Sequence, residues 1–250
     1  MTIGYLRLRQ ICLVSRNLAR AIDDIEMIFG VRLCHRDPAV GKYGLENALF
    51  PFGHSFLEVV APTRDGTAAG RFLDRSGGIG GYMAIFNCDD VARREAHAVS
   101  LGIAIAHRMQ YEAFTGVQLH PRDCRAAMIE FDATRGGEAL DGPYWPAGHD
   151  WQSHIKTDVT RGISRIDIES PMPHDIAAHW SAITEIKLGD DLTLPTSLID
   201  IRFVQGGPRE TLRTIHLDVA DPDAVNRGAE QRGYRVIDRS IDLCGVRFCY

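Results

Sequence analysis

The sequence predicts an α+β fold built from four copies of one βαβββ module. Two observations support this prediction. Strand-like segments with alternating apolar residues flank helix-like segments in a constant order. In addition, landmarks recur at a constant distance along the chain: Gly30 and Gly102, which end the first two predicted helices, are 72 residues apart, and so are Glu58 and Glu130. This self-similarity indicates an internal duplication.

The first module is the easiest to read. Residues 8–14 alternate as a strand does, and Asn17 is a suitable N-cap for the helix that follows. Apolar residues at a spacing of three to four give this helix one buried stripe, and Gly30 supplies a left-handed stop. Further strands of this module are expected at residues 31–34, 48–50 and 55–60.

The remaining modules repeat this order. In the second module, Met83 lies 73 residues after Gln10, and Asp89 or Asp90 caps a helix that ends at Gly102. Its strands are expected at residues 82–86, 103–106, 116–120 and 126–131. The third module has expected strands at 163–168, 185–188 and 198–204 and a helix at 174–183. The fourth module begins at Thr214 with a helix from Pro222 to Gly233, and it is shortened.

The segment between the second and third modules is rich in Gly, Pro and Trp. We interpret residues 136–158 as a linker that packs on the surface. It separates two paired-module domains, residues 1–135 and residues 159–250.

Composition narrows the class of protein. A net charge of −5 and a pI near 6.0 argue against a nucleic-acid partner, because such proteins usually carry a basic face. No apolar run approaches the length of a membrane span, and residues 1–7 lack the apolar core of a signal peptide. The six cysteines show no metal-binding spacing, which is typical of reduced thiols in a cytoplasmic protein. Whether the chain forms a homodimer is left open.

Three strand segments and the module order together resemble one known group of proteins. The segments are LRQICLV at 8–14, FLEVV at 56–60 and MIEF at 128–131. Four modules paired two and two resemble the vicinal oxygen chelate superfamily, which includes glyoxalase I, methylmalonyl-CoA epimerase, extradiol dioxygenases and bleomycin-resistance proteins. The resemblance implies that each module pair curls into a half-open barrel of mixed β-sheet with flanking helices.

The resemblance also implies a divalent metal inside the first barrel, such as Zn, Mn, Fe, Co or Ni. In the superfamily, the ligands come from the first and last strands of each module. Those places hold Gln10, Glu58, Met83 and Glu130 in this sequence. An amide at the first place matches a glyoxalase-like variation. Met83 is a departure, because the superfamily usually has histidine there and a thioether is a poor ligand for these metals.

His120 is a candidate to replace that histidine. If residues 118 and 130 pair across the closing hairpin, His120 faces Met128 and shares a sheet face with Glu130. The alternative is that His120, which precedes Pro121, caps a turn.

The second half lacks an equivalent set of ligands. The corresponding places fall near Arg165, Phe203, Thr214 and Arg247. We therefore expect residues 159–250 to bind no metal and to serve as a structural or substrate-covering partner.

The leading functional hypothesis is a metal-dependent lyase or isomerase of the glyoxalase type, acting on a small substrate with two oxygen atoms. Gln10, Glu58 and His120 would hold the metal, and Glu130 would transfer the proton. The alternative is a metal-free binding protein whose cavity walls are Met83, Phe50, Phe86 and Met128. An extradiol dioxygenase is less favoured, because its iron needs two histidines and a carboxylate.

Overall fold

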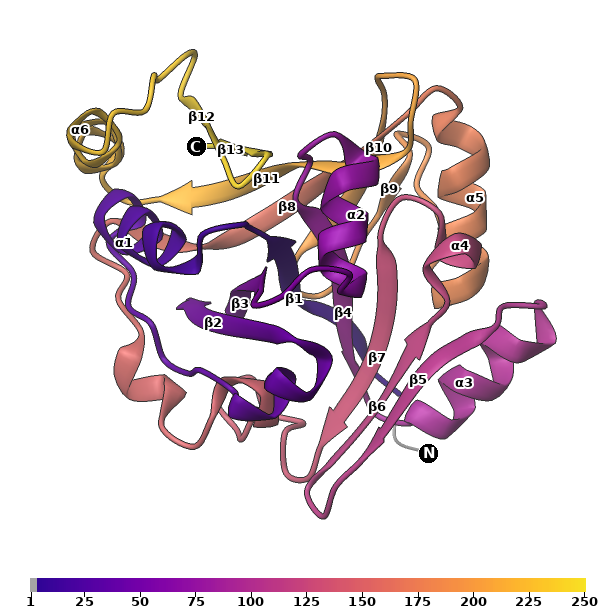
Figure 1. Cartoon of the computed structure of the whole chain (residues 1–250). Coiled ribbons are helices and arrows are strands. Elements are labelled where there is room, and N and C mark those ends of the chain that lie inside the picture. Colours follow the sequence, from indigo (N-terminus) through magenta and orange to yellow (C-terminus); the bar gives the residue numbers. More distant parts are fainter. Residues whose placement is uncertain (1–3) are drawn as a thin grey trace.

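The computed structural model describes residues 4–250, and the described chain forms one mixed sheet of 13 strands flanked by helices (Figure 1). The principal strand order is β2-β3-β1-β4-β11-β8-β10-β9, and the remaining strands continue from β4 and β11. The sheet is not closed into a barrel within the described residues. The predicted α+β class with half-open sheets is therefore confirmed. Residues 1–3, on which the expectation of no signal peptide partly rests, lie outside the described residues.

Each half of the chain contributes two modules to this sheet. The elements of the first half are β1 (Leu6–Val14), α1 (Leu18–Phe29), η1 (Pro38–Tyr43), β2 (Leu45–Phe52), β3 (Ser55–Pro62), α2 (Ala68–Ser76), β4 (Gly81–Cys88), α3 (Val91–Ser100), β5 (Ile105–Gln110), β6 (Phe114–Leu119), α4 (Pro121–Cys124) and β7 (Met128–Thr134). The later elements are η2 (Trp145–Ala147), η3 (Trp151–His154), β8 (Thr160–Ser170), α5 (Pro173–Thr184), β9 (Thr193–Leu194), β10 (Asp200–Gln205), β11 (Thr211–Val219), α6 (Pro222–Gln231), β12 (Ser240–Leu243) and β13 (Val246–Cys249).

The helix ends follow the local sequence signals closely. Asn17 caps α1 by accepting from the Arg20 backbone N–H, and Gly30 ends α1 with a φ of 67°. Asp90 caps α3 in the same way, and Pro222 occupies the first turn of α6. None of these helices spans a membrane: no helix within residues 4–250 is both long and apolar enough to do so.

The predicted elements needed three corrections, two in strands and one in a helix. Residues 31–34 do not form a strand, and only His35 makes a single bridge to Leu49. Residues 185–188 are also not a strand, because Glu185 ends α5 in a left-handed conformation. Helix α2 was not predicted, although Thr67 caps it by accepting from Gly70 N–H. A complete βαβββ module is therefore seen only in residues 81–134 of the described chain, and the other modules have three strands each.

Side chains on the two faces of the first sheet have different surroundings. Ile11 and Leu13 of β1 point into the large hydrophobic core under the helices, whereas Cys12 and Val14 belong to a smaller apolar cluster on the other face. Gln10, two residues before Cys12, lies on the same face as Cys12, and a register shift between Leu8 and Gln10 leaves Leu8 on the core face. Because side chains alternate along a strand, the core is on one side of the sheet and the inner face is free to form a site.

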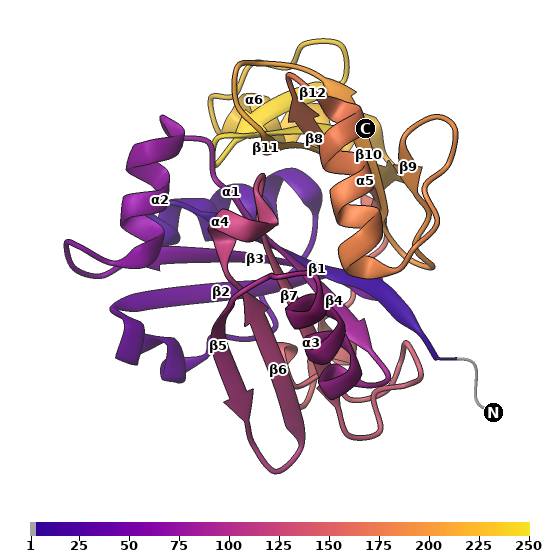
Figure 2. The ribbon, with the colours of Figure 1, turned by 90° about the vertical axis from the view of Figure 1, so that its right-hand side faces the viewer.

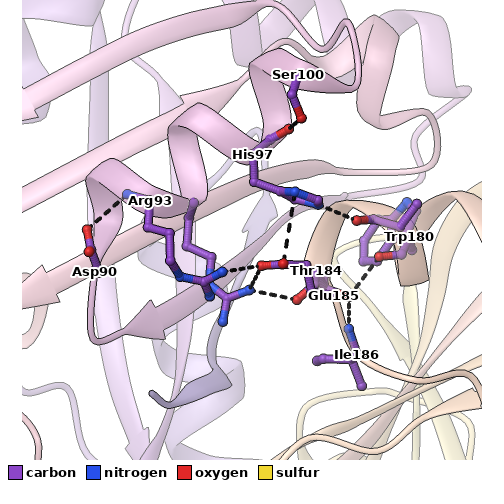
Figure 3. Close-up of polar contacts among 10 residues, drawn as sticks. Asp90, Arg93, His97, Ser100, Trp180, Thr184, Glu185 and Ile186 are labelled. Atoms are coloured by element: carbon purple, nitrogen blue, oxygen red, sulfur yellow. Dashed lines mark hydrogen bonds and ion pairs between the residues drawn. The ribbon is translucent and has the colours of Figure 1, made fainter. Parts of the chain in front are cut away.

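The two halves of the sheet meet at β4 and β11, where Gly81 pairs with Leu212. In Figure 2 the second half, coloured orange to yellow, lies above the first half. Beside this strand contact, α3 packs on α5. Arg93 Nη1 lies 2.6 Å from the carboxylate of Glu185, and Arg94 Nη1 donates to the Thr184 carbonyl over 2.9 Å (Figure 3).

A third contact joins α1 to the region around α6. Asp24 of α1, which is 1% exposed, accepts from Arg232 Nε over 2.5 Å and from the Tyr234 hydroxyl over 2.6 Å. The second half is thus fixed to the first at both of its modules as well as through the sheet. The division into two domains remains a prediction.

The segment 136–158 does more than connect the halves. Tyr144 and Trp151 are both fully buried, and the Tyr144 ring stacks on Phe56 with centroids 4.7 Å apart. The segment is therefore more than a linker that packs on the surface, because the Tyr144 and Trp151 side chains lie in the interior of the first half.

Gly81 is a point where the junction of the two halves can be tested. A Cβ atom at Gly81 would lie 2.1 Å from the Leu212 carbonyl oxygen, a backbone atom that cannot move aside easily. We expect Gly81→Ala to destabilise the protein by about 2 kcal/mol or more. The measurement is chemical denaturation of the full chain. Gly207→Ala is the matched control, because no atom lies within 4 Å of a Cβ there. Equal stability of the two variants would contradict a tight β4–β11 junction.

Candidate functional site

The inner face of the first sheet encloses a cavity of about 440 Å³. Its floor, as the term is used below, consists of five polar side chains from five strands: Gln10, Asn47, Glu58, Gln118 and Glu130. Pairing of parallel strands sets their positions, because β1 runs beside β3 and β4 runs beside β7. The structure therefore brings Gln10, Glu58 and Glu130 to one cavity, as their strand positions predict.

Glu58 is held by two side-chain amides. Its carboxylate accepts from Gln10 Nε2 over 2.9 Å and from Asn47 Nδ2 over 2.8 Å. Burial raises the pKa of Glu58, and hydrogen bonds from Asn47, Cys12 and Gln10 oppose this rise because they stabilise the ionised form. Glu58 is thus a buried carboxyl group with both oxygens already in hydrogen bonds.

Glu130 has a more open hydrogen-bonding environment. It is 5% exposed, and among the described residues only Gln118 donates a side-chain hydrogen bond to it, from Nε2 over 2.8 Å. Burial first, and then the charge of Asp132, raise the pKa of Glu130 to about 8. A carboxyl group with such a pKa is present in both protonation states near neutral pH, which suits a residue that takes up and releases protons.

A buried hydrogen-bond chain extends from the floor to the segment 136–158. The Tyr144 hydroxyl is 3.0 Å from Gln10 Oε1 and 3.2 Å from Asp132 Oδ2. Because the Gln10 carbonyl oxygen accepts from Tyr144, its NH₂ group is directed to Glu58. Asp132 also accepts from Asn87 Nδ2 over 3.0 Å, and its pKa is raised by burial to about 6. Tyr144 was not predicted as a site residue, because it lies 134 positions after Gln10.

Two of the four predicted wall residues line the cavity and two do not. Met83 and Met128 line it, and they are paired neighbours on β4 and β7. Phe50 and Phe86 instead lie in the hydrophobic core under the helices. The reason is alternation. Phe50 follows Leu49, which pairs with Glu58, and so it points to the opposite face. Phe86 likewise follows Ile85, the partner of Glu130.

His120 does not reach the cavity. The predicted pairing of Gln118 with Glu130 is present, but strand β6 ends at Leu119. His120 then caps α4, and its Nδ1 accepts from the Arg122 backbone N–H. The backbone N–H of His120 donates a hydrogen bond to the carbonyl oxygen of Ala104. The turn-capping alternative therefore describes its position, because Pro121 starts a short helix where the strand would have to continue.

The donor set does not fit a resident divalent metal. Within residues 4–250 no three His, Cys, Asp or Glu side chains are grouped so that they could hold one. Both oxygens of Glu58 accept amide hydrogen bonds, and Gln10 presents its NH₂ group, which cannot ligate, toward Glu58. Met83 occupies the place of the expected histidine. The ligand role predicted for Gln10, Glu58 and His120 thus lacks support from this geometry.

The second half has a polar cluster on its own sheet face that sequence reasoning missed. His216 Nε2 is 2.6 Å from Asp167 Oδ2, and Arg165 Nε donates to the other carboxylate oxygen over 2.9 Å. Hydrogen bonds with His216, which oppose the effect of burial, lower the pKa of Asp167. These residues lie on the paired strands β8 and β11. The sequence pattern that could have revealed the cluster is the alternation of polar residues along both strands, because the cluster forms no local motif.

Comparisons with known proteins identify the family and the fold. A family model described as a glyoxalase-like domain matches residues 11–184. A hypothetical protein from Staphylococcus aureus has the same fold, with 11% identity, a TM-score of 0.67 and coverage of 97% of this chain and 98% of that one. A Streptomyces coelicolor methylmalonyl-CoA epimerase in complex with 2-nitronate-propionyl-CoA is 20% identical, with a TM-score of 0.46 over 51% of this chain and 96% of that one. No curated protein matches the sequence.

The raised pKa of Glu130 predicts a specific pH dependence of stability. Because the folded state favours the neutral form, its contribution is complete below pH 4.5 and is lost as the pH rises toward about 8. The loss from this group is at most on the order of 5 kcal/mol, at about 1.4 kcal/mol per pKa unit. We expect Glu130→Gln to flatten the stability profile between pH 5 and pH 9 in chemical denaturation. Glu112→Gln is the control, because the Glu112 side chain is 92% exposed. An unchanged profile in Glu130→Gln would rule out the raised pKa.

The hydroxyl group of Tyr144 is expected to control the protonation of Asp132. The single hydroxyl proton of Tyr144 is shared between Gln10 Oε1 and Asp132 Oδ2, and the share that Asp132 accepts lowers its pKa. Tyr144→Phe should therefore raise that pKa by roughly one unit from its present value. The measurement is an NMR titration of side-chain carboxyl carbons. Trp151→Phe is the matched control: it changes the same aromatic cluster, and Trp151 Nε1 has no hydrogen-bond partner within the described residues. A pKa shift of equal size in both variants would show that only packing matters.

Proposed function

Because the chain belongs to the glyoxalase-like domain family, within the vicinal oxygen chelate superfamily, we propose that it is an isomerase- or lyase-type enzyme that acts by proton transfer. The substrate is a small molecule with a carbonyl or hydroxyl oxygen beside an acidic C–H bond. Glu130 is the residue that takes up and returns the proton.

The observation that carries this proposal is the environment of Glu130. It combines burial at the floor, a cavity wall of Met83, Met128 and Ile85, and a pKa of about 8. A weakly acidic carboxyl group is a stronger base once it is ionised than an exposed glutamate is. The apolar wall excludes water that would otherwise compete for the proton.

The amides of the floor can stabilise the negative charge that develops on the substrate oxygen. Gln10, Asn47 and Gln118 each donate one N–H to a carboxyl group. A primary amide has two N–H donors, which leaves a second one on each residue for an oxygen atom of the substrate. Because the hydrogen bonds to Glu58 and Glu130 already orient these amides, little reorganisation is needed during the reaction.

A divalent metal, which the resemblance implies, has no step in this proposal. The reason is that both carboxylate oxygens of Glu58 accept amide hydrogen bonds, and that Met83 stands where the superfamily has a histidine ligand. We expect metal analysis of the purified protein to find less than one divalent ion per chain, and chelator treatment to leave the thermal stability unchanged.

A metal-free binding protein without catalysis is the second candidate. The observation that favours it is the soft wall formed by Met83 and Met128, which adapts readily to different ligands. The two candidates differ in one respect: only the enzyme exchanges substrate protons with solvent.

Proton exchange provides the test. An uncharged ketone with an aromatic ring and an acidic benzylic C–H bond, β-tetralone, is incubated with the protein in D₂O, and loss of the benzylic C–H signal is followed by NMR. We expect acceleration that increases as the pD passes through the pKa of Glu130, and a loss of about 100-fold or more in Glu130→Gln. Glu112→Gln should retain the wild-type rate. Acceleration that persists in Glu130→Gln would refute the assigned role.

A further inference from the structure

The mouth of the cavity carries an exposed aromatic shelf, which we define as Tyr111 and Trp145. These residues line the cavity and are 40% and 41% exposed. Their rings are stacked at 14° with centroids 5.9 Å apart, and Phe114 continues the stack at 23° from Trp145. Tyr111 follows β5, whereas Trp145 comes from η2, so two separate segments place exposed aromatic rings side by side at the cavity.

The opposite side of the mouth is formed by η1. Tyr43 bonds through its hydroxyl to His107 Nε2 over 2.7 Å, and Lys42 Nζ is 3.3 Å from the Tyr111 hydroxyl. These contacts hold η1 against strand β5 and its turn. Tyr43 of η1 therefore adds a further aromatic ring to the lining of the cavity.

The charges around the cavity select against anionic ligands. Asp37, Glu58 and Glu130 line it, and its described lining residues include one lysine, Lys42, one histidine, His107, and no arginine. Phosphate and carboxylate groups are normally held by arginine forks or clusters of lysine. A ligand with several phosphate groups would meet three carboxyl groups and a single lysine that is already in contact with Tyr111.

The exposed aromatic rings at the mouth, the apolar wall and the small number of cationic side chains all favour one class of ligand. We propose that the cavity binds a planar, uncharged aromatic carbonyl compound, with its ring stacked on the shelf of Tyr111 and Trp145 and its oxygen directed to the floor. The cavity volume of about 440 Å³ suits a small molecule and not a protein segment. The inference rests on the proposed function for the direction of the oxygen, but ring binding is tested separately from proton transfer.

The three tryptophans give a direct measure of binding at the shelf. Trp151 and Trp180 are fully buried, so quenching by acrylamide reports mainly on Trp145. We expect β-tetralone to protect Trp145 from acrylamide in a saturable manner. Trp145→Phe removes this signal but retains a ring, and it should keep its affinity for β-tetralone in calorimetry. Trp145→Leu should bind about tenfold more weakly, because stacking is lost. Ile237→Ala, at a residue that is 50% exposed in the second half, is the matched control and should bind normally.

Charged analogues test the second part of the inference. Naphthoate and phenylacetyl-CoA carry aromatic rings with a carboxylate or with several phosphates, and each should bind at least tenfold more weakly than β-tetralone. Equal or tighter binding of either one would overturn the inference. It would also be overturned if β-tetralone did not bind, or if sedimentation showed that Trp145 is protected by self-association of the chain.

The two proposals can fail independently. Protection of Trp145 by β-tetralone without proton exchange would support the ligand class and refute the proposed enzyme. Glu130→Gln, which should stop exchange, should still bind β-tetralone through the shelf, and loss of binding in this variant would overturn stacking as the main source of affinity.

Discussion

The burial of two carboxyl groups on facing strands is the constraint on which the rest of the site depends. Burial disfavours the charged forms of Glu58 and Glu130, and the surroundings of the two side chains compensate for this cost to different extents. Around Glu58 it supplies amide donors on both oxygens. Around Glu130 it supplies one donor and leaves the pKa high. The same residue type is thus fixed by hydrogen bonds at one position and has a raised pKa at the other, where we propose that it transfers the proton.

The orientation of the floor is determined outside the floor itself. Gln10 could present either its oxygen or its nitrogen to Glu58, and the Tyr144 hydroxyl decides between them by donating to the oxygen. Tyr144 is in turn fixed by stacking on Phe56 and by the guanidinium of Arg9, 4.4 Å from its ring centroid. The segment 136–158, which connects the two halves of the chain, therefore determines how the Gln10 amide is oriented in the first half.

Local signals made much of the fold predictable. Asn17, Gly30 and Asp90 act through their own backbone neighbourhood, so their effect is visible in the sequence. The shared face of Glu58 and Glu130 was predictable from the repeat. His120 was misplaced because the end of a strand depends on tertiary packing, and alternation alone does not show where a strand stops. Tyr144 could not be assigned, because no periodic pattern connects it to Gln10, 134 residues earlier. Trp145 lies outside the repeated modules, so no periodic pattern connects it to Tyr111 and Phe114.

The continuous sheet has a consequence for how the chain can be divided. Strand β4 pairs with β1 and β7 in the first half and with β11 in the second, so separation at residue 135 would expose an unpaired strand edge at Gly81. It would also remove Tyr144 from the fragment that carries Gln10 and Glu58. Although the chain contains a series of similar modules, we expect it to fold and unfold as one cooperative unit, and its halves are poor candidates for exchange or separate expression.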